Sequence, residues 1–210
     1  MKINTEEKIL FDKAYTDENV KYVAGVDEVG RGPLAGPVVC AAVIMPLDDI
    51  VYGIDDSKKL SEKKRESLNA IIREKAIAFS IAEVQPDEID EINILQATLS
   101  CMRKAVDGLK IKPDVLLVDA LSPSVCCKTV GIIKGDTKSY NIGAASIIAK
   151  VYRDNLMRKY ADDYPEYAFD KNKGYGTKEH IAALKENGYC KIHRKTFIKN
   201  FSVEKERKPF

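Results

Sequence analysis

The stretch VAGVDEVGRGPLAGPVVCAAVIMP (23–46) decides how this chain is expected to fold. Residues 22–28 and 38–45 are apolar and rich in valine, which predicts two strands. Glycines and prolines fill the connection between them and would interrupt a helix, so we expect an antiparallel strand–loop–strand pair. The first strand ends in two adjacent carboxylates, Asp27 and Glu28, directly before the glycine-rich connection. An ordinary buried strand does not end in this way, so the stretch raises a question of function.

The composition is that of one globular domain. The chain has 210 residues, of which 45% are hydrophobic and 31% charged, which is ordinary for a single folded unit. Every apolar run is shorter than the roughly 18 residues that a membrane helix needs. The N-terminal MKINTEEKIL lacks the apolar core of a signal peptide. We therefore expect a cytoplasmic protein without a membrane anchor.

The cysteine and histidine content limits the metals that the chain can hold. Its five cysteines include an adjacent pair but no C-x-x-C spacing, and it has only two histidines. These features argue against a disulfide framework and a zinc site, and they agree with a reducing compartment. Any metal should then be a hard divalent cation held by carboxylates.

Hydrophobic periodicity along the rest of the chain predicts further strands and helices. The continuous apolar run at 114–120 is typical of a strand covered on both faces. Small residues open the helix expected over 142–160 and would let it pack closely against a sheet. Other strands are expected at 77–85 and 128–136, and other helices at 4–15, from Ser57 or Ser61 onward, and at 93–110. We predict an α/β core over residues 1–165 and a small, basic, helical segment over 166–210, together forming one compact unit.

Three expected strands deliver acids at or just beyond their carboxyl ends, namely Asp27–Glu28, Asp119 and Asp136. In open α/β sheets the ligand site lies outside these ends. A single acid of this kind is usually solvated, but clustered carboxylates repel one another and persist best when divalent cations neutralise them. Two such cations roughly 3.5–4 Å apart can activate water against a phosphodiester. Asp27 and Glu28 can share one face only if the chain turns at Glu28.

Two loops could contact a ligand. Gly30-Arg31-Gly32 resembles a dinucleotide-binding turn, but Pro33 and the following strand exclude the helix which that motif requires. The loop can instead bring backbone N–H groups close to a phosphate or a sugar hydroxyl, or it can simply be a tight connection, and these two interpretations are compatible. Tyr175 stands between two glycines in a basic loop. It could stack on a nucleic-acid base or sugar, although a tyrosine in a loop more often packs against the protein.

Three other features have both a functional and an ordinary interpretation. Ser57 and Lys58 in DDSKKLSEKKRE could hold phosphates or belong to a solvated loop. Asp154 lies on a helix that is apolar on the same face, where it should pair with a lysine or arginine or support a metal cluster. Residues 171–210 carry eleven Lys and Arg against four Asp and Glu. This excess suits a polyanionic partner, although a solvated basic tail is the more common explanation.

The chain resembles type 2 ribonuclease H, the bacterial ribonuclease HII family. The resemblance rests on pieces in family order from about Tyr22 to Phe197: GVDEVGRGPLAGPVV, DDSKKLSEKKRE, VDA, KGDTKS, GAASIIAKVYRD, NKGYGTKEH and HRKTF. It implies a ribonuclease H-like three-layer fold with a mixed central sheet and a small C-terminal helical segment. It also implies an endoribonuclease that cleaves the RNA strand of RNA–DNA hybrids and the 5′ side of ribonucleotides embedded in duplex DNA, leaving 5′-phosphate and 3′-hydroxyl ends.

The resemblance also implies roles for individual residues. Two Mg²⁺ or Mn²⁺ ions would be held, and catalysis carried, by the four acids Asp27, Glu28, Asp119 and Asp136. Gly30, Arg31 and Gly32 would read the 2′-hydroxyl, the group that distinguishes RNA from DNA, and Tyr175 would contact it and stack on the next deoxyribose. Asp154 matches an acid that the family has near the site and would support it. Apart from the resemblance, we expect Ser57 and Lys58 to bind substrate and the protein to act as a monomer.

Two alternatives remain open at this point. One is another metal-dependent nuclease on the same fold that acts on DNA, which would share the acids but would not need Gly30-Arg31-Gly32 and Tyr175. The other is a non-catalytic module that binds hybrids, which would tolerate loss of the acids. All four acids are present, which argues against the non-catalytic module.

Overall fold

The computed structural model describes residues 4–201 and contains one five-stranded mixed sheet with the order β3-β2-β1-β4-β5. β1 pairs antiparallel with β2, and β2 with β3, whereas β1–β4 and β4–β5 are parallel. The antiparallel pairing predicted for the first two strands is therefore confirmed. The strands are β1 (Val23–Val29), β2 (Val38–Ile44), β3 (Ala78–Val84), β4 (Val115–Asp119) and β5 (Lys128–Ile132).

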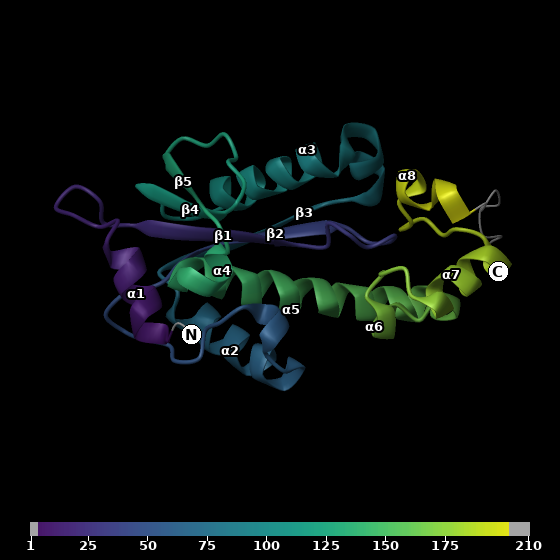
Figure 1. The fold of residues 1–210 in the computed structure, drawn as a ribbon, viewed down its shortest axis with the longest axis horizontal. Helices are drawn as coiled ribbons and strands as arrows, with labels where there is room; N and C mark the ends of the chain where they lie inside the picture. Colours follow the sequence, from purple (N-terminus) through teal and green to yellow (C-terminus); the bar gives the residue numbers. More distant parts are fainter. Residues whose placement is uncertain (1–3, 202–210) are drawn as a thin grey trace.

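Helices cover both faces of this sheet, giving the three layers that were predicted. Figure 1 shows α3 on one face and α1, α2 and α5 on the other. The longer helices are α1 (Thr5–Lys13), α2 (Glu62–Lys75), α3 (Pro86–Asp107), α5 (Tyr140–Asp163) and α7 (Lys178–Asn187). The short ones are η1 (Ser57–Lys59), α4 (Gly135–Lys138), η2 (Pro165–Tyr167), α6 (Phe169–Asn172), α8 (Lys195–Ile198) and η3 (Lys199–Phe201). Within residues 4–201, no helix is long and apolar enough to cross a membrane.

The central strands are apolar because both of their faces are covered. All seven residues of β2 are buried. On β1, Ala24 and Val26 join the core under α3, whereas Gly25 faces α5. A Cβ atom on Gly25 would lie 2.2 Å from the backbone of Asn141, so only glycine lets α5 approach the sheet this closely.

Two expected boundaries are wrong, for identifiable reasons. The helix expected at 93–110 begins earlier, at Pro86, and changes direction at Asn93, which has a left-handed φ of 67°. The Asn93 side chain accepts N–H bonds from the two residues that restart the helix, Leu95 and Gln96, so the position looks like a helix start in the sequence. The strand expected over 128–136 ends at Ile132, because Lys134 turns the chain with a φ of 57°.

The C-terminal segment packs onto the end of the sheet where β1 connects to β2. Its helices η2, α6, α7 and α8 enclose an apolar cluster with Leu34 and Ala35 of that connection and Met157 of α5. Figure 1 shows this segment beyond the end of β1, on the same side as the β1–β2 connection. Of the basic segment expected over 166–210, residues 202–210 lie outside the described part of the chain.

Candidate active site

The first three acids lie on two neighbouring parallel strands. Asp27 and Glu28 belong to β1, and Asp119 is the last residue of β4. Val26 pairs with Val118, so Asp27 and Asp119 occupy corresponding positions on the two strands. The carboxyl ends of adjacent parallel strands meet at one edge, which explains why these acids come together.

Asp136 reaches the same edge from a short helix and not from a strand. It lies in the first turn of α4, which follows the left-handed turn at Lys134. The N–H of Gly135 donates to Asp119 Oδ1 at 2.9 Å, which ties the start of α4 to the acid at the end of β4. The expectation that Asp136 ends a strand is therefore corrected, although the loop carries it to the same edge.

The chain does not turn at Glu28, which was the condition for Asp27 and Glu28 to share one face. β1 continues to Val29, so Asp27 and Glu28 alternate across the strand. Asp27 is 8% exposed, and its carboxylate accepts the N–H of Glu28 at 2.9 Å. Glu28 forms an ion pair with Arg31 at 3.5 Å. The charge of Asp119 nevertheless raises the pKa of both acids.

The pKa values show that the four acids act as one electrostatic cluster. Burial, together with the charges of Glu28 and Asp119, raises the pKa of Asp27 to about 8. Burial also raises the pKa of Glu28; Arg31 opposes this rise and Asp119 adds to it. Burial and the charges of Asp56 and Asp119 raise the pKa of Asp136. Asp119 thus disfavours ionisation of the other three, as expected for carboxylates that a cation would neutralise.

The residues of this cluster fit a divalent cation. Glu28 Oε2 is buried and has no hydrogen-bond partner, which leaves an oxygen ligand available. Among the described residues, no three or more His, Cys, Asp or Glu side chains are placed so that they could hold a metal ion by themselves. Mg²⁺ is commonly held by one or two carboxylates and completed by waters and substrate phosphates, so an incomplete carboxylate set suits it.

Two buried arginines hold the glycine loop beside the acids. Arg194 donates to the carbonyl oxygens of Gly30, Arg31 and Gly36, and Arg153 donates to those of Ala35 and Pro37. Both arginines are 0% exposed. Gly30 has a φ of 94°, and a Cβ there would meet Arg153 Nε at 2.3 Å, so the loop requires glycine at this position.

Tyr175 stands next to this loop. Its side chain is among the exposed large apolar ones, at 45% exposure, and its ring lies 3.8 Å from the Cβ position of Gly32. The loop that carries it is attached to the glycine loop, because Leu34 N–H donates to Gly174 O at 2.8 Å. Arg153 also donates to Lys173 O at 2.9 Å, so one guanidinium joins both loops.

A buried pair of histidines, His180 and His193, holds the backbone carbonyl of Tyr175. Cys190 N–H donates to His193 Nδ1 at 3.0 Å, so the His193 proton is on Nε2 and is donated to His180 Nε2 at 3.0 Å. His180 then donates from Nδ1 to the carbonyl of Tyr175 at 2.8 Å. Burial lowers the pKa of His180, and burial with the charge of His180 lowers that of His193 to about 3, so both rings are neutral near pH 7.

The remaining predicted residues surround the cluster. Ser57 is buried, with its hydroxyl 2.9 Å from that of Ser146, whose side chain hydrogen-bonds Asp27. Lys58 is exposed, and its charge lowers the pKa of Asp136 against the effects of burial and of the nearby acids.

Asp154 has the cationic partners that the sequence indicated. Its carboxylate lies 2.7 Å from Lys150 Nζ and 3.7 Å from an Arg65 nitrogen. Arg65 donates to the carbonyls of Ser57 and Leu60. Asp154 therefore acts on the acids only through Arg65, which it orients and which holds the loop around Ser57.

Sequence reasoning missed Arg153, Arg194 and the histidine pair. Arg153 lies in an otherwise buried stretch of α5, and an arginine on an apolar helical face is a signal that could have identified it. Arg194 and the histidines gave no comparable signal, because their partners lie in segments that the sequence does not connect.

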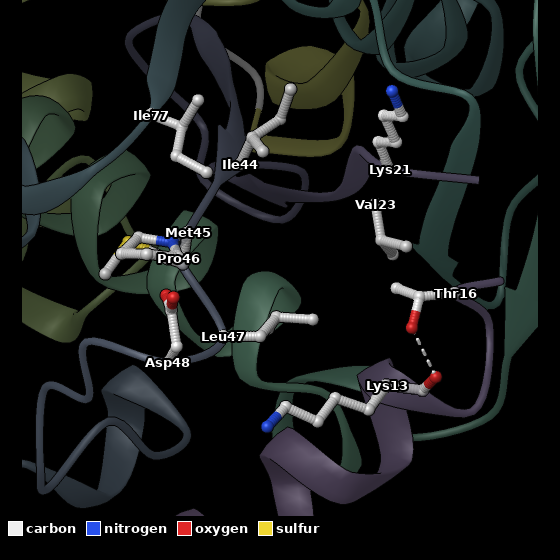
Figure 2. A pocket seen from close by; sticks show the side chains of 10 residues that line it. All are labelled: Lys13, Thr16, Lys21, Val23, Ile44, Met45, Pro46, Leu47, Asp48 and Ile77. Atoms are coloured by element: carbon white, nitrogen blue, oxygen red, sulfur yellow. Dashed lines mark hydrogen bonds between the residues drawn. The ribbon is translucent and has the colours of Figure 1, made fainter. Parts of the chain in front are cut away.

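The cavity of about 360 Å³ in Figure 2 is not part of this site. It is lined by the end of α1, the start of β1 and the chain around the end of β2, including Lys13, Val23 and Met45. Asp27 and Glu28 lie towards the other end of β1.

A mixed sheet with three acids on two neighbouring parallel strands and a fourth on the short helix α4, beside a glycine loop, is the arrangement expected of a metal-dependent phosphodiester hydrolase with a ribonuclease H-like fold. The family model described as Ribonuclease HII matches residues 24–200. The chain therefore belongs to the ribonuclease HII family and is a metal-dependent endoribonuclease of ribonuclease H type 2.

Individual relatives agree with this assignment. Ribonuclease HII of Caldanaerobacter subterraneus subsp. tengcongensis is 54% identical over 92% of this chain and 80% of its own length. That of Clostridium perfringens strain 13 is 55% identical over 94% and 75%. Among solved structures, ribonuclease H2 from Pyrococcus horikoshii OT3 superimposes with a TM-score of 0.73 at 30% identity, covering 84% of this chain and 93% of that one. The fold expected from the family resemblance is confirmed.

Proposed function

We propose that this protein cleaves the RNA strand of RNA–DNA hybrids and the 5′ side of ribonucleotides embedded in duplex DNA. It would act in the cytoplasm as a monomer and leave 5′-phosphate and 3′-hydroxyl ends. One observation carries the proposal: the acid cluster adjoins a glycine loop and an exposed tyrosine, and the buried Arg153 joins the two loops that carry them. Acids alone would suit any nuclease of this fold, whereas the added loops suit recognition of a sugar hydroxyl.

Asp27, Glu28, Asp119 and Asp136 would hold Mg²⁺ or Mn²⁺. Two bound ions would supply an activated water and stabilise the leaving oxygen of the phosphodiester. The Gly30–Gly32 backbone would approach the 2′-hydroxyl, and the Tyr175 ring beside Gly32 would contact the same hydroxyl and stack on the following deoxyribose.

The surrounding residues would set the geometry of the substrate. Lys58 is exposed near Asp136 and would contact a phosphate, whereas Ser57 would act mainly through Ser146 and Asp27 because its hydroxyl is buried. The C-terminal segment, 166–210 in the sequence, would extend the contact along the duplex through its excess of lysines.

The direct test uses three duplexes: one with a single ribonucleotide, one RNA–DNA hybrid and one all-DNA control, each with and without Mg²⁺. We expect metal-dependent cleavage of the first two and none of the third. Cleavage of the all-DNA duplex would favour a DNA nuclease instead. Binding of the hybrid without cleavage would favour a non-catalytic module.

Two variants assign the roles. Asp119→Asn keeps an oxygen that can accept the Gly135 N–H, so it should fold and bind hybrid but lose cleavage. Tyr175→Phe should reduce cleavage at single ribonucleotides more than binding. If the Tyr175→Phe enzyme cleaves as fast as the wild type, the tyrosine hydroxyl has no part in recognition.

A further inference from the structure

Helix α1 lies outside residues 24–200, yet it reaches the acid cluster through a buried lysine. Lys8 is 1% exposed, which is rare for a lysine unless its ammonium is paired. Its Nζ donates to Asp55 Oδ1 at 2.9 Å and to the backbone carbonyl of Asp136 at 3.2 Å. One ammonium therefore connects α1, the loop that leads to Ser57, and the fourth acid.

A second buried residue on the same face of α1 contacts the start of α5, just after α4. Asp12 stands four residues after Lys8, so the two side chains share one face of the helix. Asp12 is 0% exposed, and its Oδ2 accepts the backbone N–H and the side-chain amide of Asn141 at 2.8 and 2.9 Å. Asn141 lies in the first turn of α5, just after α4. Lys8 thus holds the segment at Asp136 itself, and Asp12 holds the chain that follows it.

α4 is too short to be stable as a helix by itself. It has four residues, and a single helical turn fixes several backbone angles in return for few hydrogen bonds. Two side chains from other elements anchor it: Asp119 accepts the Gly135 N–H, and Lys8 donates to the Asp136 carbonyl. Within the turn, Thr137 donates to the Lys134 carbonyl and the Ser139 N–H to the Gly135 carbonyl. Among these contacts, that of Lys8 is the one made at Asp136 itself, so it bears most directly on how Asp136 is held.

We propose that Lys8 is a positioning residue for the cleavage reaction. From helix α1 it holds Asp136 towards the other three acids. This inference rests on the proposed function. Asp12 has the complementary role of fixing the start of α5. Lys8 does not touch substrate, so its loss should affect the catalytic step and the metal requirement more than binding of the duplex.

Lys8→Met tests this directly, because it removes the ammonium and keeps an unbranched apolar stem. We expect kcat on a duplex with one ribonucleotide to fall by at least about tenfold, since small displacements of a reacting group have large effects on rate. The Mg²⁺ concentration for half-maximal rate should rise several-fold, while KM for the duplex should stay within about twofold. Lys13→Met is the matched control, because Lys13 is on the same helix, is exposed and lines the cavity of Figure 2.

A double variant separates positioning from simple charge balance. Lys8→Met leaves the Asp55 carboxylate without its ammonium partner, so the variant should lose stability and could fail to fold. Adding Asp55→Asn removes that charge and keeps an oxygen for the Asp56 N–H. We expect the double variant to regain stability but to keep the low kcat and the raised Mg²⁺ requirement, because the Asp136 carbonyl still lacks its donor.

The outcomes are distinct. If Lys8→Met, or the double variant, cleaves with wild-type kcat and Mg²⁺ dependence, Lys8 does not position Asp136 and the inference is overturned. If the wild-type protein itself fails to cleave a ribonucleotide-containing duplex with Mg²⁺, the proposed function fails instead. A low kcat in the double variant with wild-type KM and restored stability supports the positioning role.

Discussion

Replacing Arg194 by lysine tests how the glycine loop is held. Arg194 is fully buried and donates to the carbonyls of Gly30, Arg31 and Gly36 at 2.5, 2.9 and 2.7 Å. These three oxygens lie around a planar guanidinium, which presents several donors in a fixed fork. A lysine ammonium keeps the charge but is a single point on a flexible stem, so it cannot reach all three.

The magnitude follows from the number of contacts that are lost. A hydrogen bond from a charged donor contributes roughly 1.5–3 kcal/mol net. If lysine satisfies one carbonyl, loss of the other two would cost roughly 3–6 kcal/mol. The Arg31 carbonyl is only partly buried, so water can replace its donor. We therefore expect the free energy of unfolding to fall by about 3 kcal/mol, near the low end of this range.

Urea unfolding followed by circular dichroism measures that loss. The same variant should lose about 10²-fold in single-turnover cleavage of a duplex with one ribonucleotide, because the Gly30–Gly32 backbone is displaced. Arg103→Lys is the matched control, since Arg103 is exposed on α3, and it should change stability by less than about 0.5 kcal/mol. If Arg194→Lys unfolds and cleaves as this control does, the guanidinium fork does not hold the loop.

Three further predictions concern buried titratable groups. The pKa of His193 is lowered to about 3 by burial and by His180, so only the unfolded chain binds that proton as the pH falls below about 6.5. The free energy of unfolding should therefore fall by about 2 kcal/mol between pH 7 and pH 5 because of this group. His193→Gln should remove that part of the pH dependence, and equal pH dependence in the wild type and the variant would contradict the prediction. Burial raises the pKa of Asp12 to about 6, so its ionisation destabilises the fold as the pH rises from about 4 to 6. Asp12→Asn should be more stable than the wild type at pH 7 by up to about 3 kcal/mol, with the difference shrinking towards pH 4, and a pH-independent difference would refute this cause. Asp27→Asn should abolish cleavage yet raise the Tm measured in EDTA, because burial and neighbouring acids raise the pKa of Asp27 to about 8; a lower Tm would show that the carboxylate stabilises the metal-free fold.

Much of the fold could be predicted because the signals are local. The alternation and the apolar runs located all five strands, and the antiparallel start followed from the proline- and glycine-rich connection. The acids were found because each stands at or near the end of a predicted strand. The family assignment followed from motifs spread over most of the chain. It was confirmed by the family model and by relatives that are 54% and 55% identical to this chain.

The predictions failed where a backbone turn or a distant contact decided the outcome. Asp136 was assigned to a strand because nothing in KTVGIIKGD reveals that Lys134 adopts a left-handed conformation. A turn at Glu28 was the condition for both adjacent acids to share one face. The strand continues instead, and the charge of Asp119 still raises the pKa of both acids.

The sequence by itself determined the three-layer class, the acids at the strand ends and the family, because periodicity and residue type are properties of short stretches. Only the tertiary structure decided what holds those acids and loops in place. Lys8 contacts Asp136 across 128 positions of the chain, and Arg194 contacts Gly30 across 164. Such buried cations are bound by backbone carbonyls, which every residue has, so no side-chain pattern in the sequence can reveal the partner.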